Sequence, residues 1–377
     1  MLFAISTEMM IGAVQLGVVA ACIVLLVPMA MAGWHLSRNK MLFFSGVLFI
    51  SLAVCVHLTP YFPAVSDLVT SVSSIVVFDH RVSCINSVNE IVWDVKPKIH
   101  VQIGDANSSS DYYDKNWDWA KTSKVSACDF QKLSKSDASD LLNGSWVVVS
   151  GDSQARLVAL SLLNLVLGSD STRMESVRCD LFKRHSDYNI FVDEIGMKLD
   201  FIWAPYVTNF TSLIREYKRK KSYPDVMVMG AGLWHMLHFT NASDYNDDLR
   251  ILRNSVVSFL PFSSDLGTNG PVTGSESIRS PHLFWLGMPV LINSMLNTQE
   301  KREKMGDAMW HAYDRALGYS RLLRQTGGPL VLLDIESLTW NCGPRCTADG
   351  MHYDVAVYEA AVHVMLNTLL IESHQKL

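Results

Sequence analysis

Residues 146–156 read WVVVSGDSQAR, and this stretch decides the fold that we expect. Residues 146–150 are a short run rich in β-branched valine, which is typical of a buried parallel strand. The tripeptide GDS at residues 151–153 then opens an amphipathic segment that we expect to be helical to about Leu167. A buried strand that leads directly into a helix indicates an α/β sheet.

The alternation of strand and helix continues to the C-terminus. Further strands are predicted at residues 199–203, 225–229, 282–286 and 329–334. Further helices are predicted at residues 212–221, 247–260, 301–323 and 355–370. Together these elements predict an α/β fold with a doubly wound, mostly parallel five-stranded sheet of the flavodoxin-like type.

The N-terminal region is far more apolar than the rest of the chain. Residues 9–32 are long enough to cross a hydrocarbon core, and residues 41–58 form a second apolar run near the minimum length. The loop between them holds Arg38 and Lys40, which the positive-inside rule places in the cytosol. A cleaved signal peptide fits poorly, because the apolar region is too long and is doubled. We therefore expect one or two transmembrane helices, with everything after residue 58 in the lumen.

These patterns divide the chain into three predicted regions. Residues 1–58 are a membrane anchor, residues 59–140 a lumenal stem and pre-domain segment, and residues 141–377 the catalytic domain. The net charge of -5, with 18% charged residues, gives no basic field for nucleic acid, so no nucleic-acid partner is expected.

Four N-x-S/T sequons agree with a lumenal location. Asn107, Asn209 and Asn241 are the predicted glycosylation sites. Asn143 matches the same pattern but abuts a predicted buried strand, where a glycan would be awkward.

The cysteines indicate disulfides and not a metal site. Cys22 and Cys55 lie in the apolar runs, and five more are expected in the lumen: Cys84, Cys128, Cys179, Cys342 and Cys346. They lack the paired CxxC spacing of zinc sites, so no metal is predicted. Disulfides with at least one thiol left over are expected, and the spacing does not determine the pairing.

Ser153 is the first candidate for chemistry. It lies at the carboxyl end of a predicted strand, where the sites of doubly wound sheets form. At a helix N-terminus it is surrounded by backbone N–H groups, which stabilise a developing oxyanion. The structural alternative is that Ser153 or Asp152 serves only as the helix N-cap.

A serine nucleophile needs a base, and the base needs an orienting acid. Asp349 and His352 follow the last predicted strand and are three residues apart, so they lie on one side of a tight loop or first helical turn. The alternative is that His352 is an ordinary surface histidine. We predict a catalytic triad of Ser153 as nucleophile, His352 as base and Asp349 as orienting acid.

Two motifs carry a resemblance to a known family. Residues 151–156, GDSQAR, and residues 349–352, DGMH, resemble the GDS…DxxH signature of the SGNH/GDSL superfamily, and Arg156 resembles the arginine of its PC-esterase branch. Weaker blocks resemble the trichome-birefringence-like plant wall-polysaccharide O-acetyltransferases: residues 117–119, 128–130, 201–207 and 232–235. Cys346, three residues before Asp349, departs from their DCxHWC motif and is more similar to the altered-xyloglucan type.

The resemblance implies an SGNH-type fold and acetyl transfer in the Golgi membrane, with the catalytic domain in the lumen. A Ser153 acyl-enzyme would pass the acetyl group to hydroxyls of hemicelluloses such as xyloglucan and xylan. No permanently bound cofactor is implied, and the acetyl donor is left open. The alternatives are a polysaccharide acetylesterase and a non-catalytic subunit that binds other proteins of the acetylation pathway.

One departure concerns the oxyanion hole. SGNH hydrolases supply an asparagine from a G-x-N-D block, and this chain has Trp234 at that position. The predicted donors are instead the Ser153 N–H, an N–H at Gly230 or Gly232, and the Arg156 guanidinium, which returns to the same helix face one turn after Ser153. A structural salt bridge is the alternative role for Arg156.

Trp234 and His235 are the predicted substrate-binding residues, because aromatic faces suit sugar rings. The alternative is that Trp234 packs in the core and that His235 caps a helix.

Overall fold

The computed structural model describes residues 84–98, 112–168, 171–259 and 281–374. The predicted membrane spans at residues 9–32 and 41–58 lie outside the described residues, as does Asn107. All described residues belong to one compact unit, Val82–Leu377.

The centre of this unit is a six-stranded sheet in the order β4-β5-β3-β6-β7-β8. Its strands are β3 (Trp146–Gly151), β4 (Tyr188–Val192), β5 (Met197–Trp203), β6 (Val226–Gly230), β7 (His282–Leu286) and β8 (Val331–Leu333). All neighbours pair in parallel except β4 and β5, which are antiparallel. The mostly parallel sheet is as predicted, but the prediction of five strands is wrong. The sixth strand, β4, is an edge strand whose residues alternate in burial, so it lacks the continuous apolar run that marked the others.

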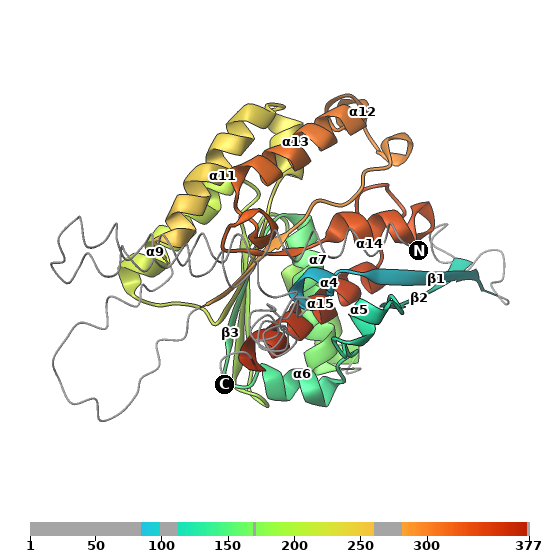
Figure 1. Cartoon of the computed structure of the whole chain (residues 1–377), viewed down its shortest axis with the longest axis vertical. Helices are drawn as coiled ribbons and strands as arrows, with labels where there is room; N and C mark the ends of the chain where they lie inside the picture. The colour runs from blue at the N-terminus through green and yellow to red at the C-terminus, as the bar shows by residue number, and fades with distance from the viewer. Residues whose placement is uncertain (1–83, 99–111, 169–170, 260–280, 375–377) are drawn as a thin grey trace, which may run out of the picture. The chain divides into compact units, whose positions relative to one another are not determined.

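Helices cover both faces of the sheet. They are α7 (Ser153–Leu167), α8 (Ser171–Leu181), α9 (Val207–Lys220), α10 (Leu233–His238), α11 (Ala242–Val257), α12 (Gln299–Lys304), α13 (Asp307–Ser320), α14 (Ile335–Cys342) and α15 (Val355–His374). In Figure 1, α9, α11 and α13 lie together on one side of β3, and α7 and α15 lie on the other. The helix predicted at residues 301–323 is two helices, because Gly306 adopts an extended conformation and caps α13.

The apolar run of β3 is explained by this double covering. Val147 and Val149 belong to the cluster that includes α7 and α15, and Val148 belongs to the cluster with α9, α11 and α13. All three valines are fully buried, because successive strand residues point to opposite faces and both faces are covered.

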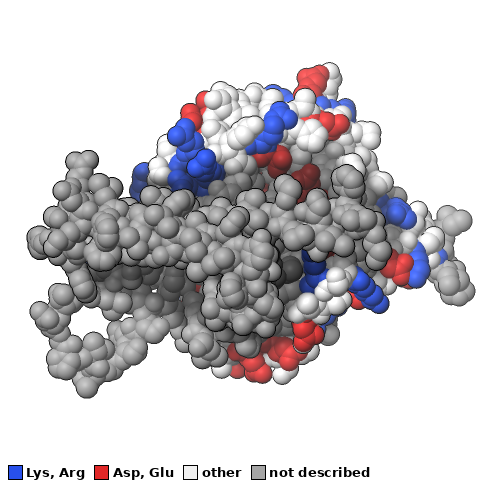
Figure 2. All heavy atoms as spheres, viewed as in Figure 1, with Lys and Arg blue, Asp and Glu red and all other residues white. Residues whose placement is uncertain are grey.

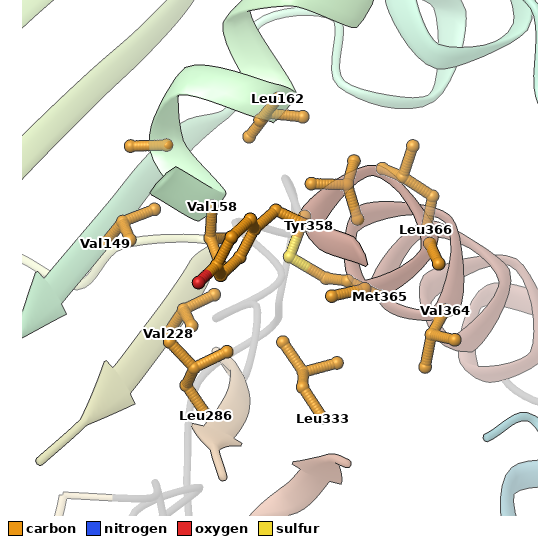
Figure 3. Packing of buried hydrophobic residues seen from close by; sticks show 14 of the residues in the cluster. Val149, Val158, Leu162, Val228, Leu286, Leu333, Tyr358, Val364, Met365 and Leu366 are labelled. Atoms are coloured by element: carbon orange, nitrogen blue, oxygen red, sulfur yellow. The ribbon is translucent and has the colours of Figure 1, made fainter. Parts of the chain in front are cut away.

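Helix α15 is the one described helix that is long and apolar enough to cross a membrane, over Val355–Ser373. The structure uses it as a core helix: 72% of that window is buried. Figure 3 shows Tyr358, Val364 and Met365 of α15 packed towards side chains of α7 and the sheet. Packing in the core therefore accounts for the apolar composition of α15.

Part of the predicted stem belongs to the same core. The described residues between 84 and 141 include α4 (Cys84–Ser87), β1 (Ile91–Pro97), β2 (Tyr113–Trp119), α5 (Ser123–Ser126) and α6 (Lys135–Leu141), and β1 pairs with β2 in antiparallel fashion. Trp117 and Trp119 are buried in the cluster that contains α7 and α15. The Trp119 indole donates to the Val88 carbonyl at 3.0 Å. Residues on both sides of the boundary predicted at residue 140 therefore share one hydrophobic core.

The five cysteines of the described region form two disulfides and leave one thiol. Cys84 is bonded to Cys128, and Cys342 is bonded to Cys346. Cys179 is free and exposed. On the face drawn in Figure 2, Lys and Arg side chains lie in separate groups with acidic side chains between them.

Candidate active site

The GDS turn places Ser153 at the carboxyl end of the sheet. Strand β3 ends at Gly151, and Asp152 is the N-cap of α7, with its carboxylate accepting from the Gln154 N–H at 2.9 Å. A Cβ atom at Gly151 would lie 2.5 Å from the Gly230 carbonyl oxygen, so only glycine permits this approach of β3 and β6. Ser153 is then the first residue of α7, where the backbone N–H lacks an acceptor within the helix.

The loop after α14 brings the other two triad residues to this point. The Oγ of Ser153 lies 2.7 Å from Nε2 of His352, and Nδ1 of His352 lies 2.7 Å from Oδ2 of Asp349. The Cys342–Cys346 disulfide lies at the start of the loop. Thr347 closes it by donating to the His352 carbonyl at 2.7 Å and accepting from the Gly350 N–H at 3.0 Å. The three predicted triad residues thus form one continuous hydrogen-bonded chain.

The hydrogen bonds of Asp349 determine its charge and its role. Its Oδ1 accepts from the backbone N–H groups of Met351 at 2.9 Å and His352 at 2.7 Å. Burial raises the pKa of Asp349, but its hydrogen bonds with His352 and Met351, together with the nearby His352 charge, lower that pKa well below its usual range. An ionised carboxylate only accepts, so Nδ1 of His352 carries the proton and Nε2 is free to accept from Ser153.

Gln154 is a positioning residue that sequence reasoning missed, although it lies within the GDSQ motif. Its amide donates to the Met351 carbonyl at 3.0 Å, one residue before His352. The Tyr358 hydroxyl donates to the amide oxygen of Gln154 and accepts from the Tyr353 N–H at 3.4 Å. In Figure 3 the Tyr358 ring of α15 lies near Val158 and Val228, so the helix core anchors this polar chain. The nucleophile helix and the histidine loop are thereby joined.

Arg156 lies one helical turn after Ser153 on α7. Its side chain is 6% exposed, and its Cζ lies 5.0 Å from the ring centres of both Phe201 and Trp203. Nε and Nη2 have no hydrogen-bond partner among the described residues, so the alternative of a structural salt bridge is not realised there. Burial lowers the pKa of the guanidinium, and the negative charge of Asp152 opposes this effect.

A pocket of about 320 Å³ opens beside the triad. Its wall includes Ser153, His352 and an aromatic group formed by His185, Trp203 and Trp234. The rings of Trp203 and Trp234 meet edge to face at 5.5 Å, and His185 stacks on Trp203 at 4.8 Å. Trp234 therefore lines the pocket beside the triad, and its role in substrate binding stays a prediction. His185 and Trp203 join it without having been predicted, because the position of their segments depends on how β4 and β5 pair.

His235 lies elsewhere, and its expected substrate contact is corrected. It is 4% exposed and surrounded by the rings of Tyr206, Phe239 and Tyr245, and it does not line the pocket. Burial lowers the pKa of His235 to about 4. Helix α10 causes the difference, because consecutive residues of a helix point in different directions.

The two predicted oxyanion glycines are near the pocket but do not line it. Gly230 ends β6, and Gly232 is the N-cap of α10 with φ +153°. A Cβ atom at Gly232 would meet the Met288 sulfur at 2.3 Å, which explains the glycine. The pocket wall begins one residue after Gly232, at Leu233, the first residue of α10.

The chain was compared with protein-family models, solved structures and curated proteins. No protein-family model matches it. Two solved structures are matched to part of this chain: TesA is 15% identical with a TM-score of 0.33, covering 59% of this chain and 97% of TesA. Axe2, an acetylxylan esterase from Geobacillus stearothermophilus, is 12% identical with a TM-score of 0.34, covering 61% of this chain and 95% of Axe2.

A curated plant protein is far more similar. Protein ALTERED XYLOGLUCAN 9 of Arabidopsis thaliana is 69% identical over 371 residues, which are 98% of this chain and 100% of that protein. The resemblance to the altered-xyloglucan type is confirmed, and the chain belongs to the family of Protein ALTERED XYLOGLUCAN 9.

Proposed function

We propose that this protein is an O-acetyltransferase that moves acetyl groups through a Ser153 acyl-enzyme onto hydroxyls of plant wall hemicelluloses. The observation that carries the proposal is the hydrogen-bonded chain from Ser153 through His352 to Asp349, with 2.7 Å at both side-chain links. The name of the Arabidopsis relative refers to xyloglucan, which supports a hemicellulose such as xyloglucan or xylan as the acceptor.

The first half of the reaction is acylation of Ser153. The hydroxyl oxygen attacks the acetyl carbonyl carbon of the donor while its proton passes to Nε2 of His352. Asp349 stabilises the imidazolium that forms. When the tetrahedral intermediate collapses, the bond to the donor breaks and the departing group takes the proton from His352. The result is an acetyl ester on Ser153 and a neutral His352.

The second half returns the enzyme to its starting state. A sugar hydroxyl enters the pocket, gives its proton to Nε2 of His352 and attacks the acetyl ester. Ser153 leaves and regains its proton from His352, and the sugar carries the acetyl group. Water in place of the sugar yields free acetate by the same steps. The aromatic residues Trp203 and Trp234 in the pocket wall support a sugar acceptor, since aromatic side chains are common in sugar-binding sites.

The negative oxygen of both tetrahedral intermediates needs donors. The proposed first donor is the Ser153 N–H at the start of α7, and the second is the N–H of Leu233, which lines the pocket and takes the role of the asparagine that Trp234 replaces. The Arg156 guanidinium adds a fixed positive charge to the same wall.

The location that we propose is the Golgi membrane, with the catalytic unit in the lumen and the N-terminal apolar runs as anchor. Two disulfides support an oxidising compartment. Asn143, Asn209 and Asn241 are exposed, as glycan attachment requires, although the last two side chains also accept hydrogen bonds at helix N-termini. Other proteins of the acetylation pathway are the proposed partners.

The test follows the acetyl group. Purified full-length chain is incubated with a reactive acetyl ester, with and without xylo-oligosaccharides and xyloglucan oligosaccharides. Intact-mass analysis detects acetyl-enzyme, and product analysis separates acetylated sugar from free acetate. We expect acetyl-enzyme on Ser153 and acetylated sugar, and neither from Ser153→Ala.

The other outcomes identify the alternatives. Free acetate at the same rate with and without sugar would replace the transferase with an acetylesterase. A Ser153→Ala protein that acetylates sugar as fast as the parent would refute the acyl-enzyme. A folded chain that forms neither acetyl-enzyme nor product would favour a non-catalytic subunit.

A further inference from the structure

The pocket beside Ser153 carries three cationic side chains that a neutral acetyl ester and a neutral sugar do not require. Arg156 belongs to α7, Arg184 follows α8, and Lys301 belongs to α12. The acidic residue on the same wall is Asp152, which is 2% exposed and occupied as the cap of α7. The wall of the pocket is therefore positive although the whole chain has a net charge of -5.

Arg156 is the buried member of the three. It is 6% exposed, and two of its nitrogens, Nε and Nη2, have no hydrogen-bond partner in the described part of the chain. Leaving charged donors unsatisfied in the interior is unfavourable. Nε and Nη2 are themselves buried, so a negative oxygen in the pocket would act on Arg156 mainly by offsetting a charge that the fold leaves without an ion pair.

Arg184 and Lys301 make no ion pair with a described residue, unlike the nearby lysines Lys183 and Lys304. Lys183 pairs with Asp180 at 2.8 Å, and Lys304 pairs with Glu300 at 2.7 Å. Among the described residues, no carboxylate lies within ion-pair distance of Arg184 or Lys301, and both line the pocket. Lys183 and Lys304, which do not line the pocket, therefore have carboxylate partners, whereas the two cations on its wall do not.

We propose that Arg184 and Lys301, with Arg156 behind them, form a subsite for an anionic group of the substrate, a phosphate or a carboxylate close to the group that reacts at Ser153. This inference rests on the proposed function, because it takes Ser153 as the reacting residue. About 320 Å³ is near the lower limit for a small-molecule site, so one sugar ring or one short acyl donor fits with its anionic substituent.

Two sources supply this chemistry. A phosphorylated acyl donor would bring its phosphate in the first half of the reaction, and a hemicellulose with a uronate side group would bring its carboxylate in the second half. In both cases the charges orient the reacting group towards Ser153. Arg184 is exposed and Lys301 is half-buried, so added salt weakens the attraction.

Binding is tested first on the full-length Ser153→Ala chain, which needs no chemistry. The pocket variant carries Arg184→Gln and Lys301→Gln, and the matched control carries Lys183→Gln and Lys304→Gln. Calorimetric titration uses inorganic pyrophosphate and glucuronate as probes. We expect at least one probe to bind, with a Kd that rises about tenfold in the pocket variant and less than about twofold in the control. Equal losses in both variants, or no binding of either probe to Ser153→Ala, would overturn the subsite.

The second measurement uses the parent chain and a neutral fluorophosphonate that labels activated serines. For this measurement the pocket and control substitutions are made in the parent chain, which keeps Ser153. Bound anion should slow the labelling of Ser153 in the parent and in the control, but not in the pocket variant. Protection by pyrophosphate indicates a phosphorylated donor, and protection by glucuronate indicates a uronate-bearing acceptor. A labelled Ser153 that neither anion protects refutes the subsite and leaves the proposed function standing. An unlabelled Ser153 beside normal anion binding refutes the function and leaves the subsite.

Discussion

The pocket at Ser153 encloses about 320 Å³, whereas a second cavity, beside α13 and α14, encloses about 540 Å³. The larger one is lined by Asp314, Asp334 and Glu336, and no serine, cysteine or histidine lies among its described lining residues. The smaller one has a serine hydrogen-bonded to a histidine. Volume alone would therefore select the wrong region for acyl transfer, because the reaction needs a nucleophile joined to a base.

The pKa values of Glu336 and Asp314 in the larger cavity and of Asp349 in the triad are shifted in opposite directions. Burial raises the pKa of Glu336 to about 7, and the negative charges of Asp314 and Asp334 contribute to the increase. Burial likewise raises the pKa of Asp314. Asp349 receives three hydrogen bonds from His352 and Met351, so its pKa is lowered instead. A carboxylate becomes an orienting acid when the loop supplies donors to it, and its pKa rises when it is buried with other carboxylates and without such donors.

The sharpest way to break this comparison is to change one carboxylate in each region. Asp349→Asn keeps the shape but removes the charge that favours the active tautomer, and in a related triad this costs on the order of ten-thousand-fold in turnover. We expect a loss approaching that size in the rate of acetyl-enzyme formation, with little change in thermal melting. Asp314→Asn, the matched change in the larger cavity, should leave the rate unchanged. A rate within about tenfold of the parent for a folded Asp349→Asn chain would remove Asp349 from the mechanism.

Asp152 sharpens the comparison, because it lies beside the triad and yet its pKa is raised by burial, as in the larger cavity. Burial raises its pKa to about 6, so the native state binds this proton more tightly than the unfolded chain. Stability is lost as pH rises from about 4 to about 6, by on the order of 2 kcal/mol. Asp152→Asn keeps the helix cap and should remove this loss.

The measurement is urea denaturation of the parent and Asp152→Asn chains at about pH 4 and about pH 8. We expect the variant to gain stability relative to the parent only at the higher pH. A variant that is less stable than the parent at both values would show that the ionised carboxylate is needed for the cap.

Gln154 tests whether the loop that carries His352 needs its link to α7. Gln154→Ala removes the hydrogen bond to the Met351 carbonyl and leaves the Tyr358 hydroxyl without its acceptor. We expect acetyl-enzyme formation to slow by about tenfold, in line with the loss of other orienting partners. Gln325→Ala, a change of the same type in the larger cavity, is the control. The rate of Gln154→Glu is compared with that of the parent at the same pH, because acid also protonates the His352 base. A ratio that rises towards the parent as pH falls, where a protonated carboxyl can donate, would separate positioning from packing.

The smallest expected effect lies in the larger cavity. The raised pKa of Glu336 means that stability is lost as pH rises from about 4 to about 7. Glu336→Gln should therefore raise the free energy of unfolding at about pH 8, by no more than about 1 kcal/mol because the side chain is partly exposed. Activity should not change. A loss of acetyl transfer in this variant would show that the larger cavity takes part in the reaction.

Local pattern determined most of the fold in advance. The apolar runs at residues 146–150, 225–229 and 282–286 became parallel strands, because a strand buried on both faces must be apolar throughout. Three strands were not predicted: edge strand β4 and the antiparallel pair β1 and β2. Their residues alternate in burial, so they lack a continuous apolar run, and no local pattern identifies the strands with which they pair.

For the site, the sequence by itself determined the nucleophile turn and the DGMH loop, since each is a short motif whose geometry is set by neighbouring residues. Only the tertiary structure decided that Ser153 and His352, 199 residues apart, lie within hydrogen-bond distance. It also decided that Trp234 and not His235 reaches the pocket, that Gln154 is joined to Tyr358, and which cations remain unpaired there. The physical reason is that a motif fixes backbone conformation over a few residues, whereas contacts between distant segments depend on how the sheet orders its strands and how the helices pack on it.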